Sequence, residues 1–202
     1  MSITVRNEYF YFDSKDETNL DEFIEFINRP DNLNGKFELI DGYIVAMAGN
    51  ASFNHQRISG YLFRMIGNYL EGKTCEVVHD INAFLYNDEI GKCKNVFQPD
   101  ILVGCDKSKM TEKGYEGTPE FIVEVVSKST ARNDYIIKLN RYMEFGVKEY
   151  WIVDSDKNKI LVCLNAGDQP PAISEFTFKD CVKVNIFDDL RINFNEILKI
   201  IN

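Results

Sequence analysis

The chain has 202 residues and a mass of 23.4 kDa, with 45% hydrophobic and 27% charged residues. This composition is typical of a globular protein with one buried core, and it excludes a disordered or fibrous chain. The formal net charge of −9 disfavours nonspecific coating of nucleic acid, because phosphate affinity comes mostly from Lys and Arg, although a local basic patch or a metal site would still bind phosphate.

The first elements along the chain are a short helix and a hairpin. Asn19 precedes acidic residues and apolar residues at helical spacing, which predicts an amphipathic helix that stops at Pro30. Two β-rich runs over 36–47 flank Asp41 and Gly42, the pair best able to take positive φ at the centre of a tight turn. We therefore expect a β-hairpin there.

The middle of the chain is expected to alternate between helix and strand. Asn54 can cap a helix with a broad apolar face, which ends at Gly72. Three strands follow, at 77–86, 96–104 and 120–127. The third is an apolar run around a single acid, as expected of a strand buried on both faces.

The last third is expected to begin with a helix over 133–145 and a buried strand over 149–154. A strand over 159–164 comes next, and the remainder is interpreted as a loop, short strands and a helix near 195–200. The four strands predicted between residues 77 and 154 should form one sheet, with the two long helices packed on it. Because the sequence has no repeat, low-complexity tract or linker, we expect one α/β domain over 1–202.

The sequence contains no run of the roughly 18 apolar residues that a membrane helix needs, and residues 1–8 lack a signal pattern. We therefore expect a soluble, cytoplasmic protein without a membrane partner. Five cysteines are far apart and form no CxxC pair, so we expect neither a disulfide nor a zinc site, and a function that survives reductant. These cysteines are Cys75, Cys93, Cys105, Cys163 and Cys181.

Three charged residues lie in or beside apolar segments, where a charge is costly unless it is paired or bound to a metal. Asp100 follows Pro99, which removes a ladder donor; the plain alternative is a turn or capping acid. Glu124 lies between apolar runs, so its carboxylate should be partly desolvated. Lys138 either forms a solvated i,i+4 pair with Asp134 or directs its amine toward Glu124.

Seven short motifs follow one another in order between residues 37 and 154. They are FELIDG at 37–42, HQ at 55–56, QPD at 98–100, EVVSKST at 124–130, Asp134 with Lys138, Tyr142, and GVKEYWIVD at 146–154. The ordered series resembles the Uma-type restriction endonuclease family of the PD-(D/E)xK nuclease superfamily, over roughly residues 18–165. The resemblance implies a restriction-endonuclease-like core over about residues 36–165. Its order is helix, three strands, helix, strand, in a mixed sheet flanked by helices, with the N-terminal helix and β-hairpin in addition.

The resemblance also implies roles for individual residues. In the superfamily, the Pro-Asp acid and the acid of the next strand bind a divalent metal, which here implies Asp100 and Glu124. The lysine that assists the attacking water normally lies two residues beyond the second acid, but Val126 stands there. In the Uma-type family this lysine has moved to the following helix, at the position of Lys138. Lys128 is the local alternative.

The implied cofactor is Mg²⁺ or Mn²⁺. A hard cation is usually held by one or two carboxylates plus substrate phosphate, and the carbonyl of Val125 could supply a neutral third ligand. Secondary candidates are Glu38, His55 and Gln98. Glu38 is either a further metal ligand or water-positioning acid, or a solvated hairpin acid; His55 is alternatively a capping or packing residue.

These residues predict a metal-dependent phosphodiester hydrolase, specifically a DNA endonuclease, with RNA as a substrate that is not excluded. The alternative is a non-catalytic nucleic-acid-binding or assembly module on the same fold, whose acids satisfy a polar cavity. Either protein could be a homodimer. The sequence has no Ser-His-Asp arrangement, GxGxxG motif or P-loop, so hydrolase triads, dinucleotide binding and P-loop chemistry lack support.

Overall fold

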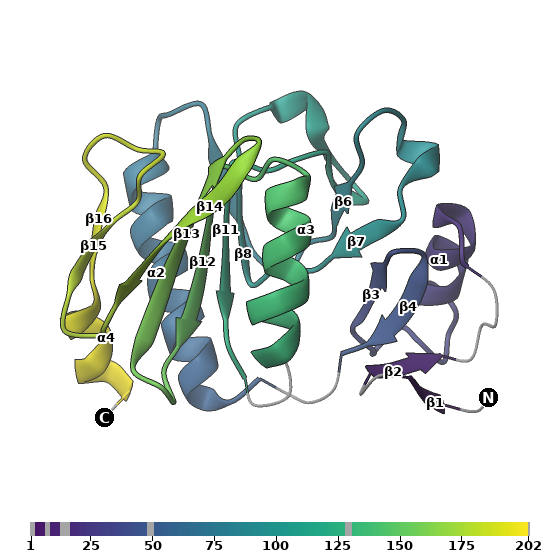
Figure 1. Cartoon of the computed structure of the whole chain (residues 1–202), viewed down its shortest axis with the longest axis horizontal. Coiled ribbons are helices and arrows are strands. Elements are labelled where there is room, and N and C mark those ends of the chain that lie inside the picture. The colour runs from purple at the N-terminus through teal and green to yellow at the C-terminus, as the bar shows by residue number, and fades with distance from the viewer. Residues whose placement is uncertain (1–2, 7–8, 13–16, 48–50, 128–130, 202) are drawn as a thin grey trace.

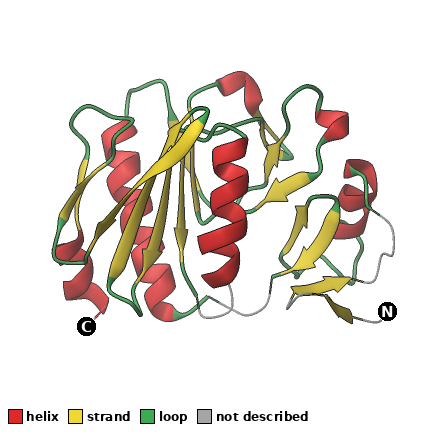
Figure 2. Cartoon of the chain, in the orientation of Figure 1, coloured by secondary structure: helices red, strands yellow, loops and turns green. Residues whose placement is uncertain are grey.

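The structure is a computed structural model, which describes residues 3–6, 9–12, 17–47, 51–127 and 131–201 (Figure 1). Their strands form a six-stranded sheet, an eight-stranded sheet and a two-stranded sheet. Figure 2 shows how helices and strands alternate through the molecule, in agreement with the predicted α/β class. None of the helices described is both long and apolar enough to cross a membrane.

The six-stranded sheet lies at the centre of the fold and has the order β14-β13-β12-β11-β8-β5. β11 and β12 are parallel, and the other neighbouring strands are antiparallel. The two parallel strands are buried along their whole length, as predicted for apolar strands covered on both faces. The strands of this sheet are β5 (Glu76–Val78), β8 (Ile101–Gly104), β11 (Phe121–Val125), β12 (Glu149–Asp154), β13 (Lys159–Ala166) and β14 (Gln169–Phe176).

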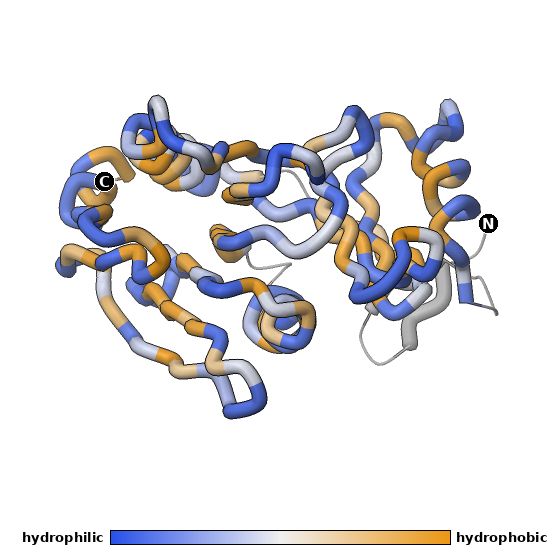
Figure 3. Tube along the Cα trace, turned by 90° about the horizontal axis from the view of Figure 1, so that it is seen from above, coloured by the Kyte–Doolittle hydropathy of each residue, from blue (hydrophilic) through white to orange (hydrophobic). Residues whose placement is uncertain are grey.

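Helices cover both faces of this sheet (Figure 3). On one face lies α2 (Phe53–Leu70), which buries an apolar stripe against alternate residues of β11 such as Val123. On the other face lies a helical segment formed by the π-helix η3 (Asn133–Lys138) and α3 (Leu139–Glu144). Since successive side chains of a strand alternate between faces, Glu124 points toward α3.

The eight-stranded sheet has the order β1-β2-β4-β3-β7-β6-β10-β9 and is covered by α1 (Leu20–Ile27). The predicted hairpin is confirmed in it, because Asp41 (φ 52°) and Gly42 (φ 82°) form the turn between β3 and β4. The strands are β1 (Ile3–Arg6), β2 (Tyr9–Phe12), β3 (Phe37–Ile40), β4 (Tyr43–Ala46), β6 (Ala83–Leu85), β7 (Asn95–Phe97), β9 (Met110–Thr111) and β10 (Gly114–Glu116).

The C-terminal part packs beside α2 on the same face of the six-stranded sheet. It consists of the hairpin β15 (Cys181–Lys183) and β16 (Arg191–Asn193), followed by α4 (Phe194–Ile201). Two short 3₁₀ helices, η1 (Ile90–Lys92) and η2 (Lys107–Lys109), complete the described elements.

The prediction of one sheet for residues 77–154 is wrong, because two of the predicted strands are each divided between the two large sheets. The first becomes β5 and β6, separated by Asp80, whose positive φ of 51° interrupts an extended strand. The second becomes β7 and β8, separated by Pro99 and Asp100. Proline cannot donate to a ladder, so the pairing changes sheets there.

The helix termini follow the capping chemistry of the sequence. Asn19 caps α1 in a reciprocal capping box with Glu22, as the residue pattern predicted. The cap of α2 is Ser52 rather than Asn54, since the Ser52 side chain accepts the backbone N–H of His55. Near the C-terminus, the segment that contains Pro170 forms the edge strand β14, where proline is tolerated.

The prediction of five unpaired thiols is wrong for Cys75 and Cys105, which form a disulfide. The antiparallel pairing of β5 with β8 matches Glu76 to Gly104 and so brings the two flanking cysteines face to face, with Cα atoms 3.9 Å apart. A separation of 30 residues along the chain gives no local sign of this pairing. The other three cysteines are free thiols.

Candidate active site

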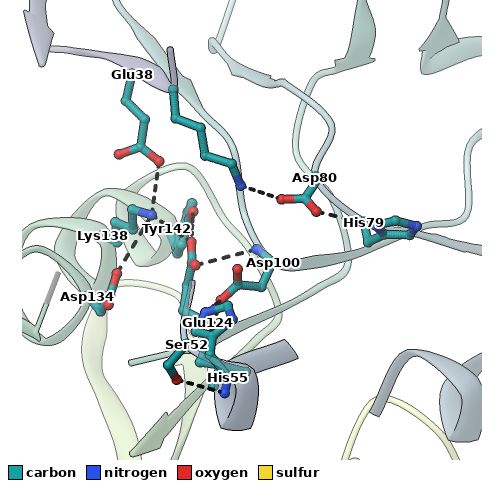
Figure 4. A network of polar contacts seen from close by, with 12 residues as sticks. Glu38, Ser52, His55, His79, Asp80, Asp100, Glu124, Asp134, Lys138 and Tyr142 are labelled. Atoms are coloured by element: carbon teal, nitrogen blue, oxygen red, sulfur yellow. Dashed lines mark hydrogen bonds and ion pairs between the residues drawn. The ribbon is translucent and has the colours of Figure 1, made fainter. Parts of the chain in front are cut away.

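The structure brings Asp100, Glu124 and Lys138 together where the two large sheets meet the helix (Figure 4). Asp100 lies at the crossing between β7 and β8, Glu124 lies in β11, and Lys138 ends η3. The backbone N–H of Asp100 donates to Glu124 Oε2 at 3.4 Å, and Lys138 Nζ donates to Glu124 Oε1 at 2.8 Å. These contacts unite the three residues that the sequence singled out.

Lys138 is a core residue, with 2% of its surface exposed. Its Nζ lies 2.9 Å from Glu38 Oε1 and 3.7 Å from Asp134 Oδ1, in addition to its contact with Glu124 (Figure 4). The interpretation of Lys138 and Asp134 as a solvated i,i+4 pair is therefore wrong. The predicted direction of the amine, toward Glu124, is the observed one.

Asp100 is fixed by a histidine and by a backbone amide. His55 Nε2 lies 3.1 Å from Asp100 Oδ2, and the N–H of Val125 donates to the same oxygen at 2.7 Å. Burial lowers the pKa of His55, but the hydrogen bond and the charge of Asp100 outweigh burial and raise the pKa overall. His55 thus contacts a site acid from the first turn of α2.

Glu38 belongs to the same cluster, so its interpretation as a solvated hairpin acid is wrong: it is 1% exposed. The backbone N–H of Gln98 donates to Glu38 Oε1 at 3.1 Å, while the Gln98 side chain donates to the carbonyl of Asp80 at 2.9 Å. Gln98 therefore supports Glu38 through its backbone. Within the described residues, the buried Glu38 Oε2 has no hydrogen-bond partner.

Two members of the cluster were not predicted as site residues. Asp134 is buried beside Lys138, and the Tyr142 hydroxyl donates to Glu124 Oε1 at 3.1 Å. The spacing of Asp134, Lys138 and Tyr142 would have placed all three on one helix face. Whether that face meets the sheet or the solvent depends on tertiary packing, which the spacing does not contain.

The charges of the cluster do not balance. Burial raises the pKa of Glu124 well above its usual range, and the neighbouring carboxylates add to this while Lys138 opposes it. Burial lowers the pKa of Lys138, but the surrounding carboxylates raise it well above its usual value, so the amine stays protonated. Glu38, Glu124 and Asp134 thus surround one ammonium group, and Asp100 lies beside Glu124, an excess of carboxyl groups that attracts cations.

Asp100 and Glu124 are the residues of this cluster that could hold a divalent cation, with the backbone of Val125 beside them. Among the described residues, no three His, Cys, Asp or Glu side chains form a complete metal-binding group. A site with two carboxylates nevertheless suits Mg²⁺, which keeps several waters and binds substrate phosphate as well. The unpartnered, buried Glu38 Oε2 is a further oxygen in the same cluster.

The prediction of the catalytic lysine involved two further positions, Val126 and Lys128. Val126 continues the sheet, because its N–H donates to the carbonyl of Val153 at 2.9 Å. Lys128, the alternative to Lys138, lies outside the described residues.

Comparisons with known proteins agree with this architecture. A family model named Uma2, described as "Putative restriction endonuclease", matches residues 20–194. An uncharacterized protein of Synechocystis sp. (strain PCC 6803) is 30% identical over 138 residues, which cover 67% of this chain and 70% of that protein. A crystal structure from Anabaena variabilis, titled a "putative nuclease belonging to DUF820", matches with a TM-score of 0.71 at 16% identity. That match covers 90% of this chain and 97% of the other, so the two chains share a fold.

Proposed function

Because the chain belongs to the Uma2 restriction endonuclease family, we propose that it is a metal-dependent phosphodiester hydrolase that cuts DNA. The observation that carries this proposal is the buried ammonium of Lys138, 2.8 Å from Glu124 Oε1, in a cluster that also contains Asp100. Two carboxylates can hold a divalent cation, and a protonated amine beside them can stabilise charge on a phosphate, which suits hydrolysis of a phosphodiester.

We further propose Mg²⁺ or Mn²⁺ as the cofactor, held by Asp100 and Glu124 with the carbonyl of Val125 as a neutral ligand. The excess of carboxyl groups supports this assignment, and so does Glu38 Oε2, which has no hydrogen-bond partner among the described residues. When bound, such an ion supplies a water of lowered pKa and neutralises charge on the phosphate.

Residues of the chain itself supply the other parts of the proposed mechanism. Lys138 orients the attacking water or stabilises charge that develops on the phosphate. Tyr142 and Glu38 hold the Glu124 carboxylate and the Lys138 amine in place, through contacts of 3.1 and 2.9 Å. His55 holds Asp100 through its contact of 3.1 Å with Oδ2.

A non-catalytic nucleic-acid-binding or assembly module is the second candidate function. The observation that favours it is the engagement of Lys138 by three acids, which satisfies the buried ammonium without substrate. The net charge of −9 favours the assembly form of this alternative, because it disfavours nonspecific binding of nucleic acid. This alternative predicts an intact fold that does not cleave.

The test is cleavage of a supercoiled plasmid, a single-stranded DNA and a single-stranded RNA, each with Mg²⁺, Mn²⁺ or EDTA. Glu124→Gln removes the central carboxylate, and Glu149→Gln is the matched control, since Glu149 is a buried strand acid that bonds Trp151 and Ile186 instead. We expect metal-dependent cleavage of DNA that is lost in the first variant and retained in the second.

Cleavage that persists in EDTA or in folded Glu124→Gln would contradict the proposal. Metal-dependent cleavage of the RNA but of neither DNA would support metal-dependent hydrolysis and show that the substrate is RNA. A folded wild-type protein that cuts none of the three substrates would favour the binding module.

A further inference from the structure

Helix α2 differs in charge from the rest of the molecule. The chain has 32 acidic residues, yet none of them lies among the 18 residues from Phe53 to Leu70. The same helix carries Arg57 and Arg64 on its exposed side. Since its apolar stripe is buried against the six-stranded sheet, the opposite face is the part of α2 that meets solvent.

The exposed face of α2 pairs each arginine with an aromatic ring. The guanidinium of Arg57 lies over the Phe53 ring at 4.3 Å, and that of Arg64 lies over the Tyr61 ring at 5.3 Å. Neither arginine forms an ion pair within the described part of the chain, so both charges remain available to an anion. Phe53 is 73% exposed, so its ring is accessible to a ligand.

The exposed face of α2 lies opposite the side of the helix that reaches the candidate active site. His55 lies in the first turn of α2 and contacts Asp100, while Phe53, two residues earlier, lies about 200° away around the helix axis. At about 1.5 Å per residue, the stretch from Phe53 to Arg64 is on the order of 16 Å long, the span of roughly five nucleotides at about 3.4 Å each. A strand bound along this face would therefore lie on the solvent side of α2, opposite the side through which His55 contacts Asp100.

We propose that the exposed face of α2, formed by Phe53, Arg57 and Arg64 beside the half-buried Tyr61, binds the single-stranded part of a nucleic-acid substrate. The two arginines bind backbone phosphates, and Phe53 stacks on an unpaired base. Positive charge interleaved with aromatic rings is the combination that recognises single strands without reading sequence. The inference rests on the proposed nuclease function and names its substrate class: nucleic acid with an unpaired segment.

The test measures binding apart from cleavage. Fluorescence anisotropy of a labelled single-stranded DNA 20-mer and of its duplex is recorded in EDTA over a range of salt concentrations. The variants are Arg57→Gln with Arg64→Gln, Phe53→Ala and Phe53→Trp. The matched control is Arg191→Gln, because Arg191 is also exposed and forms no ion pair among the described residues, but lies on β16.

We expect the double arginine variant to weaken single-strand binding and to lower the slope of log K against log salt by about 1.4, from roughly 0.7 per phosphate contact. Phe53→Ala should weaken binding of the single strand by about 5- to 150-fold, the range for loss of one stacked base, and leave the duplex unaffected. Phe53→Trp should bind like the wild type, and so should Arg191→Gln.

The inference is overturned if the α2 variants bind the single strand as the wild type does, or if Phe53→Ala changes duplex and single-strand binding equally. Its failure is separable from that of the proposed function. Metal-dependent cleavage that needs Glu124 while the α2 variants bind normally would overturn the inference alone. Arginine-dependent binding by a protein that never cleaves would support the inference and overturn the nuclease.

Discussion

Lys138 is a buried charge that affects both the stability of the fold and the proposed cleavage. Its amine contacts Glu38, Glu124 and Asp134 at 2.9, 2.8 and 3.7 Å, and all four side chains are buried. A buried charge cluster of this kind contributes little net stability when complete, but removal of one partner leaves uncompensated charges in the core. The residue should therefore matter for folding as well as for cleavage.

Lys138→Met should lower the free energy of unfolding by about 3–5 kcal/mol, because it leaves three buried carboxylates without their cation. Lys199→Met is the control: Lys199 forms an exposed i,i+3 pair with Glu196, and its removal should cost less than about 1 kcal/mol. Urea denaturation measures both. Equal losses in the two variants would show that Lys138 is not part of a buried network.

A pH effect is expected at Glu149. Burial raises its pKa, although hydrogen bonds from Trp151, Ile186 and Asn185 oppose the shift. A raised native pKa means that the folded state binds the proton more tightly than the unfolded state, so this stabilisation is present below about pH 4.5 and is lost as pH rises through the native pKa. The free energy of unfolding of the wild type should therefore fall relative to Glu149→Gln as pH rises from 4.5 to 7.

Urea denaturation at several pH values checks this slope, with both proteins in EDTA. Glu149→Gln also weakens hydrogen bonds that the Glu149 carboxylate accepts, so its absolute stability is not informative. The measured quantity is the difference between the two proteins in the slope of unfolding free energy against pH. Parallel curves, or a wild type that gains stability with pH relative to the variant, would refute the expectation.

At the scale of elements, capping and breaking residues explain most of what the sequence could predict. The capping box of Asn19 and the turn at Asp41 and Gly42 are local chemistry, and both predictions are confirmed. Strand pairing is not local. Pro99 marks a break that the sequence displays, but no residue nearby specifies that the strands on its two sides join different sheets.

The link between β5 and β8 is another long-range feature with a measurable consequence. Cys105→Ser should lower the free energy of unfolding of the oxidised protein by about 2–4 kcal/mol, since it releases a loop that the disulfide closes. Cys181→Ser, which changes an exposed free thiol, is the control. Urea denaturation with and without reductant measures both.

Reductant should lower the stability of the wild type to that of Cys105→Ser and should leave the variant unchanged. If the stability of the wild type does not change with reductant, the Cys75–Cys105 bond does not form in solution. That activity survives reductant stays a prediction.

Two glycines offer a paired test of backbone conformation. Gly42 has a φ of +82° and lies close to the Glu17 side chain, so Gly42→Ala should cost about 1–2 kcal/mol. Gly60 lies within α2 with open space where a Cβ would be, so Gly60→Ala should stabilise by roughly 0.5–1 kcal/mol. Thermal denaturation shows whether each variant is less or more stable than the wild type. Two variants that shift stability in the same direction would contradict the prediction.

At the scale of the whole molecule, the candidate site depends on how the two large sheets and one helix pack. Glu38 comes from the eight-stranded sheet, Glu124 from the six-stranded sheet and Lys138 from η3 (Figures 1 and 4). The sequence identified Asp100, Glu124 and Lys138 because each is a charge in or beside an apolar segment. It left Glu38 open between a site acid and a solvated hairpin acid and did not predict Asp134 as a site residue, because their burial depends on packing between segments far apart in the chain.

The distribution of charge also belongs to this scale. The net charge is −9, yet α2 carries no acid and begins beside the cluster. Acids gathered around a bound cation no longer repel phosphate, so a nuclease can be acidic overall and still bind its substrate. Homodimerisation stays a prediction.

The most direct test of the account is the single-turnover rate of DNA cleavage with Mg²⁺, measured for the wild type, Lys138→Met and Lys128→Ala at equal concentrations of folded protein. We predict that Lys138→Met slows cleavage by a factor of about 10² to 10³, the effect of losing one group that stabilises transition-state charge, and that Lys128→Ala cuts at the wild-type rate. Equal rates for the wild type and Lys138→Met, or a collapse in Lys128→Ala alone, would contradict it.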